Sequence, residues 1–218
     1  MKKLFFLFVV SLFLLVSCNI NISNNRSSSS NINTTTNTSI PSSNKSSVTS
    51  PKPSEDNTID VLVVYFSPLG EENNIVNKLA SSYDADTFEI KPLYPYNKAD
   101  LDFNNPSSRV SIEYSDPYRQ VELLTLYVEN FEKYDYVFIG APIWYGKLSW
   151  VINDFITNNE FYDKTIIPFG VSDIFDLDVS NIKELAPYST VVDGKKFSSR
   201  ASEKDINDWM KEVSSIID

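Results

Sequence analysis

The stretch "VVYFSPLGEENNIV", residues 63–76, predicts a buried strand, a short turn with one glycine, and the start of a helix. A β-branched apolar run suits a strand that is covered on both faces, and Ile75 and Val76 begin an apolar helical face. This order of elements is the layout of a phosphate cradle, in which backbone N–H groups at a helix N-terminus bind the anion. Glu71 and Glu72, however, stand where a phosphate has to sit.

Strands and helices alternate along the rest of the domain. We predict further strands at 87–90, 136–140, 165–170 and 190–192, and helices at 74–82, 120–131, 148–156, 182–185 and from Ser202 onward. Such alternation indicates an α/β fold: a doubly wound, five-stranded parallel sheet of order 2-1-3-4-5 with helices on both faces. In that architecture ligands bind beyond the carboxyl ends of the strands, so the loops after the first, third and fourth strands form the predicted site.

Composition excludes several classes of function. The chain has 218 residues, a net charge of −10, no histidine and a single cysteine, Cys18. An acidic chain without a basic stripe is unsuited to nucleic acid, and we predict no nucleic-acid partner. Without histidine, Ser-His-Asp and Cys-His catalysis and the usual zinc sites are excluded, so chemistry depends on carboxylates, hydroxyls, lysines or a cofactor.

The N-terminus has the pattern of a targeting segment. Lys2 and Lys3 precede a short apolar core, and "LVSC", residues 15–18, resembles the lipobox of bacterial lipoproteins. We therefore predict a signal peptide at 1–17, a lipid on Cys18 that anchors the chain in the bacterial cell envelope outside the cytoplasm, a disordered Asn/Ser/Thr-rich tether at 18–57, and a folded domain at 58–218. The alternative is an ordinary secretory signal in which Cys18 is incidental.

Five stretches, in this order, resemble the flavodoxin family: "VLVVYFSPLG" (61–70), "YPYNKADLDFNNPSSR" (94–109), "YDYVFIGAPIWYGKLSWVINDFI" (134–156), "DKTIIPFG" (163–170) and "ASEKDINDWM" (201–210). The resemblance implies FMN as cofactor and transfer of one or two electrons as activity. It also implies that three loops hold the cofactor. The predicted cofactor-binding residues are Ser67, Pro68, Leu69, Gly70, Glu71, Glu72, Pro142, Ile143, Trp144, Tyr145, Gly146, Val171, Ser172 and Asp173.

The three loops match the family pattern to different degrees. In the first loop Ser67 and Gly70 match, but the glutamates replace hydrogen-bond donors with acceptors that repel a phosphate. In the second loop, Trp144 and Tyr145 either stack on a flavin ring or pack on the edge of the domain. The third loop has no glycine after Gly170, which makes a close backbone approach to the flavin harder. Its aspartates, Asp173, Asp176 and Asp178, would oppose the negative charge of a reduced flavin.

These observations leave three hypotheses. The first is a membrane-anchored flavodoxin-type electron carrier or oxidoreductase with an eroded phosphate loop, which binds FMN weakly and serves a redox partner that the sequence does not identify. The second is a non-enzymatic lipoprotein that has lost FMN and binds a protein partner. The third is a divalent-cation site built from the acidic side chains at this edge of the sheet, namely Glu71, Glu72, Asp173 and Asp176.

Overall fold

The computed structural model describes residues 59–217, and its first strand is β1 (Val61–Tyr65). Successive side chains of a strand point to opposite faces, and β1 buries both sets. Val61 and Val63 join one hydrophobic core, while Leu62 and Val64 join the other. The two cores therefore lie on opposite faces of the sheet, as the apolar run predicts.

Strand β1 lies between β2 and β3 in a sheet whose strand order is β2-β1-β3-β5-β6. The other strands are β2 (Asp86–Glu89), β3 (Tyr136–Trp144), β4 (Lys147–Leu148), β5 (Thr165–Val171), β6 (Thr190–Val191) and β7 (Lys195–Phe197). All pairings are parallel except the β3–β4 hairpin, and β6 and β7 both pair with β5. The predicted order 2-1-3-4-5 is confirmed, with the fifth strand split into β6 and β7.

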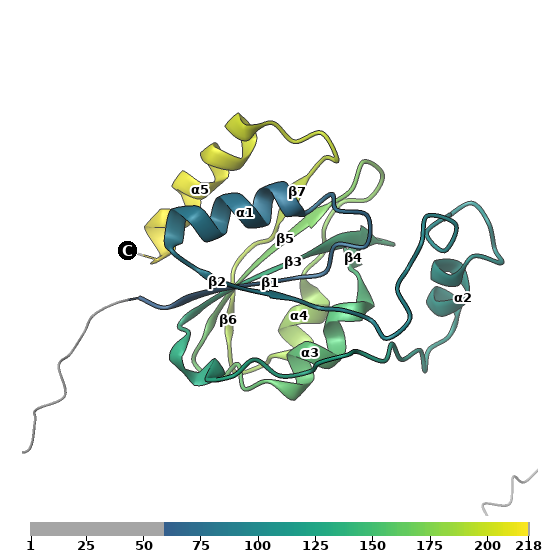
Figure 1. The fold of residues 1–218 in the computed structure, drawn as a ribbon, viewed down its shortest axis with the longest axis horizontal. Helices are drawn as coiled ribbons and strands as arrows, with labels where there is room; N and C mark the ends of the chain where they lie inside the picture. The colour runs from purple at the N-terminus through teal and green to yellow at the C-terminus, as the bar shows by residue number, and fades with distance from the viewer. Residues whose placement is uncertain (1–58, 218) are drawn as a thin grey trace, which may run out of the picture. The chain divides into compact units, whose positions relative to one another are not determined.

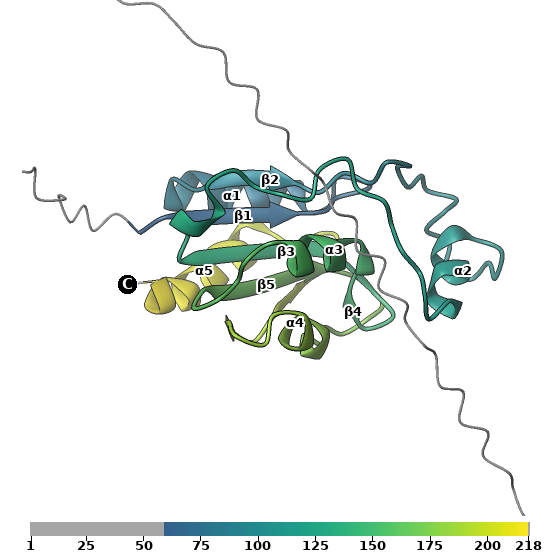
Figure 2. The same cartoon turned by 90° about the horizontal axis from the view of Figure 1, so that it is seen from below.

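Helices cover both faces of this sheet (Figure 1). The helices are α1 (Asn73–Tyr83), α2 (Arg109–Ser115), α3 (Asn153–Asn158), α4 (Ser180–Leu185) and α5 (Glu203–Ile217), with 3₁₀ turns η1 (Phe131–Lys133) and η2 (Trp150–Ile152). Helices α1 and α5 lie on one face, and α3 and α4 lie on the other. Helix α2 is set apart, beyond the carboxyl ends of the strands (Figures 1 and 2).

The predicted helix at 120–131 is wrong. Only the short turn η1 is helical there, and the chain before it runs extended along residues 91–93. Leu93 N donates to Glu122 O (2.8 Å), and Leu124 N donates to Lys91 O (2.8 Å). Residues 121 and 124 would lie on the same face of a helix. In the structure they have different surroundings, because Val121 is buried and Leu124 is exposed. The missed helix, α2, begins at Ser108, whose hydroxyl accepts from Ser111 N (3.3 Å).

The last helix begins next to Ser202, as predicted. Ser202 Oγ accepts from Asp205 N (3.2 Å), and Asp205 Oδ2 accepts from Ser202 N (2.9 Å). This reciprocal pair is a capping box with Asp in place of the usual Glu. The apolar face that follows is buried against the sheet through Ile206, Trp209 and Val213.

The predicted signal peptide, the lipid-bearing Cys18 and the tether lie outside the described residues. Within residues 59–217, no helix is long and apolar enough to cross a membrane.

Candidate flavin site

The loops after β1, β3 and β5 meet at one cavity of about 200 Å³. They meet because these strands are parallel neighbours, so their carboxyl ends lie at the same edge of the sheet. Most of the residues predicted from the three loops line this cavity: Pro68, Leu69, Glu71, Glu72, Pro142, Ile143, Trp144, Val171, Ser172 and Asp173. We call it the site cavity.

Four further residues complete the lining of the site cavity: Leu101, Phe103, Ile174 and Ser199. Leu101 and Phe103 come from the stretch at 94–109, which resembles the flavodoxin family without carrying recognisable chemistry. The resemblance of this stretch to the family was therefore the feature of the sequence that could have placed Leu101 and Phe103 at the site. Ser199 follows β7, and nothing in its local sequence separates it from other loop serines.

Glu72 is folded into the loop that follows β1. Its side chain is buried, with 1% of the residue exposed, and Ser67 Oγ donates to its Oε2 (2.6 Å). The same hydroxyl accepts from Glu72 N (3.3 Å). Oε1 of Glu72 is buried and has no hydrogen-bond partner among the described residues. The Glu72 carboxyl group is therefore held inside the loop after β1, on the Ser67 hydroxyl that the family resemblance assigns to the cofactor.

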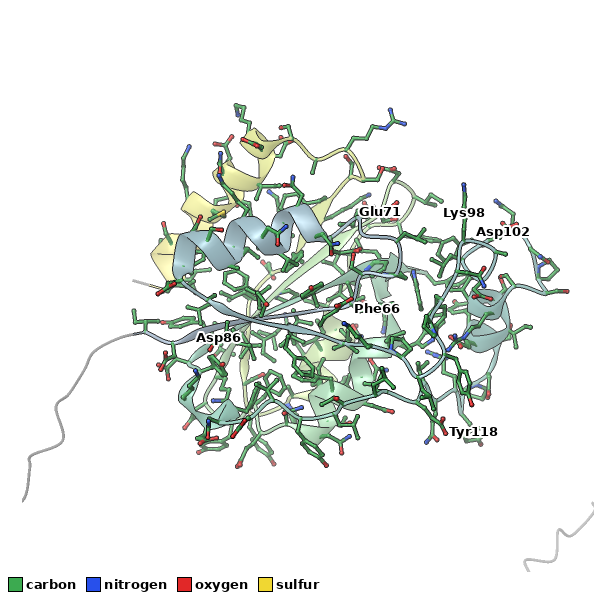
Figure 3. All side chains as sticks on the ribbon, viewed as in Figure 1. Phe66, Glu71, Asp86, Lys98, Asp102 and Tyr118 are labelled. Carbon is green, nitrogen blue, oxygen red and sulfur yellow. The ribbon has the colours of Figure 1, made fainter. Side chains whose placement is uncertain are left out.

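Glu71 has a different position. It is exposed and lies at the N-terminal end of α1 (Figure 3). The two adjacent glutamates thus separate into one that closes the loop and one that faces solvent on the rim of the cavity. Sequence alone could not distinguish them.

Burial raises the pKa of Glu72 to about 7, and the hydrogen bonds from the Ser67 side chain and from its own backbone N–H oppose that rise. The nearby charge of Glu71 adds a smaller increase. A buried carboxyl group without full hydrogen bonding favours its neutral form because desolvation penalises the charge. At neutral pH this group is therefore divided between its protonated and ionised forms.

A pH dependence of stability follows from this pKa. Because the pKa of Glu72 is raised on folding, its protonated form stabilises the fold below about pH 4.5, and that contribution, about 3 kcal/mol, is lost as the pH rises through about 7. We expect Glu72→Gln to gain stability relative to the wild type by about 1–3 kcal/mol on going from pH 5 to pH 8. Urea unfolding of both proteins at both pH values measures this difference. An equal difference at the two pH values would contradict it.

Trp144 belongs mainly to the core. Its ring packs at 5.8 Å from that of Phe66, 5.2 Å from Tyr96 and 4.9 Å from Trp150, measured between centroids. Only 3% of the residue is exposed. Trp144 lines the site cavity, but its aromatic neighbours place the ring in the hydrophobic core and not on the edge of the domain.

Tyr145 already has a stacking partner in this chain. The ring of Tyr114, on α2, lies parallel to it at 3.7 Å with an interplanar angle of 9°. Phe103 and Phe175 pack around the same ring at 5.5 and 5.6 Å. These rings form an aromatic cluster in which Phe103 also lines the site cavity, and Tyr114 covers one face of the Tyr145 ring.

Gly146 serves the β3–β4 hairpin. Tyr145 (φ 50°) and Gly146 (φ 88°) both have positive φ, which is the requirement of the tight two-residue turn that suits twisted hairpins. Trp144 and Lys147 pair across it. This turn gives a structural reason for glycine at position 146.

The loop after β5 uses its polar groups internally. Ser172 Oγ accepts from Ile174 N (3.1 Å) and Phe175 N (3.0 Å). Asp173 accepts from both the hydroxyl and the N–H of Ser199, and these hydrogen bonds lower the pKa of Asp173. The third hypothesis, a cation site, gains no support, because within residues 59–217 no three acidic side chains gather in a way that could hold a metal ion.

The charge of the site cavity disfavours a phosphate. Its lining includes Glu71, Glu72 and Asp173 and, among the described residues, no lysine or arginine. Arg109 is directed elsewhere, because its Nε donates to Glu113 Oε1 (2.6 Å) and its guanidinium lies over the ring of Tyr96. With Glu72 in the loop, and no lysine or arginine among the described residues that line the cavity, the residues present do not fit the phosphate of FMN.

Known proteins resemble this domain in sequence and structure. The family model for flavodoxin matches residues 60–213. A candidate flavoprotein from Bacteroides eggerthii is 34% identical with a TM-score of 0.63, over 71% of this chain and 98% of that one. One from Bacteroides uniformis is 30% identical with a TM-score of 0.64, over 70% and 98%. No curated protein matches the chain.

A more distant structure shows the same fold. A flavoprotein from Lactobacillus acidophilus, solved in complex with FMN, is 19% identical with a TM-score of 0.51, over 70% of this chain and 99% of that one. The family model covers most of the domain, and the two Bacteroides proteins align over nearly their whole length. This chain belongs to the flavodoxin family.

Proposed function

We propose that the domain binds a flavin reversibly at the site cavity, through the ring and the ribityl chain, and not through a phosphate in the loop after β1. The observation that carries this proposal is the convergence of the three loops on one cavity. Membership of the flavodoxin family and the FMN complex of the Lactobacillus relative support a flavin as the ligand. A bound flavin would supply electron transfer, which needs no histidine or cysteine from the protein.

The size of the site cavity supports weak, exchangeable binding. Sites that enclose a small organic ligand usually have volumes of roughly 300–1,000 Å³. At about 200 Å³, this cavity encloses only part of a flavin. Its apolar wall, formed by residues such as Leu101, Phe103 and Ile143, offers a surface against which an aromatic ring can lie.

The cellular setting is part of the proposal. A lipid on Cys18 and a polar tether would place the domain at a membrane surface of the cell envelope, where a redox partner protein would exchange electrons with it. Labelling of the expressed chain with a radioactive fatty acid tests the anchor, and Cys18→Ala is expected to abolish the label.

A second candidate function is supported by the way the chain fills its own site. Glu72 is buried in the loop after β1 and accepts from Ser67 Oγ, and Tyr114 stacks on one face of Tyr145. Both features are consistent with a flavodoxin-fold lipoprotein that works without flavin and binds a protein partner.

A flavin titration decides between the two functions. The full chain, in detergent, is titrated into FMN and, separately, into riboflavin at pH 8, and quenching of flavin fluorescence is followed. We expect saturation at one flavin per chain, with FMN bound no more tightly than riboflavin. Absence of quenching with both flavins would sink the flavin proposal and leave the second candidate. Much tighter binding of FMN would show that the phosphate is held after all.

A further inference from the structure

Residues 97–119 form an arm that contains α2 and lies beyond the carboxyl ends of the strands (Figures 1 and 3). Leu101 and Phe103 of this arm line the site cavity, so the arm supplies part of the apolar wall against which a flavin ring would lie. Helix α2 has seven residues, which are too few for a stable helix in isolation. The position of the arm therefore depends on the contacts that it makes with the rest of the domain.

The carboxylate of Glu113, on α2, joins the arm to the body of the domain. Its Oε2 accepts hydrogen bonds from the Tyr96 hydroxyl (2.6 Å) and from Nε1 of Trp150 in η2 (2.7 Å). Its Oε1 accepts from Arg109 Nε (2.6 Å), one turn earlier in the helix. Only 15% of the Glu113 side chain is exposed, so these charge-assisted hydrogen bonds lie largely out of water, where they are strong.

The two residues that donate to Glu113 Oε2 also pack against a wall of the site cavity. The rings of Tyr96 and Trp150 lie 5.2 and 4.9 Å from that of Trp144, and Trp144 lines the cavity. All three residues belong to one hydrophobic core. Rings in a close-packed core do not shift independently, so the hydrogen bonds to Glu113 help to set the position of Trp144.

Contacts within and beside the arm connect α2 to the other wall residues. Val110 N donates to Asp100 O (2.9 Å), beside the arm residues that line the site cavity. Phe103 and Tyr114 pack on the same ring, that of Tyr145, at 5.5 and 3.7 Å. The placement of α2 therefore fixes the placement of the apolar wall.

We propose that Glu113 is a positioning residue for the flavin site, because it holds α2 and, through the arm and Trp144, the wall against which the flavin ring lies. This inference rests on the proposed binding of a flavin at the site cavity. The wall would contact the ring and not a phosphate, so a change at Glu113 is expected to alter the affinities for FMN and riboflavin by the same factor.

Fluorescence titration of the full chain in detergent, with FMN and with riboflavin at pH 8, tests this role. Glu113→Gln removes the charge and keeps the shape of the side chain. It is expected to weaken binding of both flavins by roughly 3- to 30-fold, the range in which a change along a network of contacts alters a distant site. Tyr96→Phe removes one donor to Glu113 and keeps the ring, so a smaller loss is expected. Because both substitutions break the same hydrogen bond, their effects on affinity are expected to be non-additive in the double variant.

Two control variants separate positioning from general damage to the fold. Glu212→Gln removes an exposed carboxylate of α5, and Val213→Ala removes buried methyl groups from the core on the opposite face of the sheet. Both are expected to bind riboflavin like the wild type. In the flavin-free protein, the NMR signal of the Trp150 indole N–H is expected to move in Glu113→Gln and to stay in place in both controls.

The outcomes distinguish this inference from the function on which it rests. If the wild type quenches neither flavin, flavin binding fails and the role of Glu113 fails with it. If the wild type binds both flavins and Glu113→Gln binds them equally well or more tightly, flavin binding stands and the role of Glu113 is overturned. A loss confined to FMN, additive effects of Glu113→Gln and Tyr96→Phe, or an equal loss in Val213→Ala would also overturn it.

Discussion

Glu72→Thr is expected to tighten FMN binding by roughly 10- to 1,000-fold, because it removes a carboxylate that repels a phosphate by about 1–4 kcal/mol. The substitution also frees Ser67 Oγ, which now donates to Glu72, and adds a second hydroxyl donor at the N-terminal end of α1. Riboflavin has no phosphate, so its affinity is expected to change little. Fluorescence titration of both flavins at pH 8 measures the effect.

Two further variants identify its cause. Glu72→Gln removes the charge of the side chain and keeps its volume. If FMN affinity rises less for Glu72→Gln than for Glu72→Thr, the difference measures the effect of the filled space apart from charge repulsion. Glu71→Gln removes the exposed neighbouring charge and is expected to change FMN affinity by less than about 3-fold, since exposed charges are screened by water and salt. If Glu72→Thr improved FMN and riboflavin equally, the idea of a closed phosphate loop would be wrong.

Trp209→Ala is expected to lower the free energy of unfolding by about 3–5 kcal/mol. Trp209 is the central contact of α5 on the sheet, with 3% of the residue exposed. Its ring lies 5.9 Å from that of Phe138, 5.8 Å from Phe169 and 5.4 Å from Phe197, so truncation leaves a cavity between the helix and strands β3, β5 and β7. Urea unfolding followed by far-UV circular dichroism gives the value.

Tyr118→Ala provides the comparison, because Tyr118 is 88% exposed on the segment after α2 (Figure 3). Its removal is expected to change stability by less than about 0.5 kcal/mol. A loss below about 1 kcal/mol for Trp209→Ala would show that α5 docks weakly and that the core beneath it can collapse into the space.

Structural features that depend on residues close together in the sequence could be predicted. The β-branched run of β1 requires burial on both faces, and the capping pair Ser202 and Asp205 marks the start of α5, because both depend on neighbours within a few residues. Parallel strands then bring the loops after β1, β3 and β5 to one edge of the sheet, so the location of the site also followed from the order of the elements.

The extended segment before η1 shows the limit of such patterns. Val121 joins the core on the α3 side of the sheet while Leu124 is exposed, and backbone hydrogen bonds tie this irregular chain to Lys91 and Leu93, far away in sequence. Apolar spacing over a short window does not reveal which distant strand will supply hydrogen bonds. Tertiary contacts therefore overrode the local helical preference.

Hydrophobic periodicity and the alternation of strands with helices predicted the fold, and the parallel topology then predicted the edge of the sheet where the candidate site lies. The state of that site was decided by folding. Glu71 and Glu72 are the same residue type side by side, yet only Glu72 turns inward to the Ser67 hydroxyl and is buried. Likewise, Tyr114 reaches Tyr145 only because α2 lies against the β3–β4 turn, 31 residues along the chain. Burial, charge and stacking at this site are properties of segments that meet only in the folded protein.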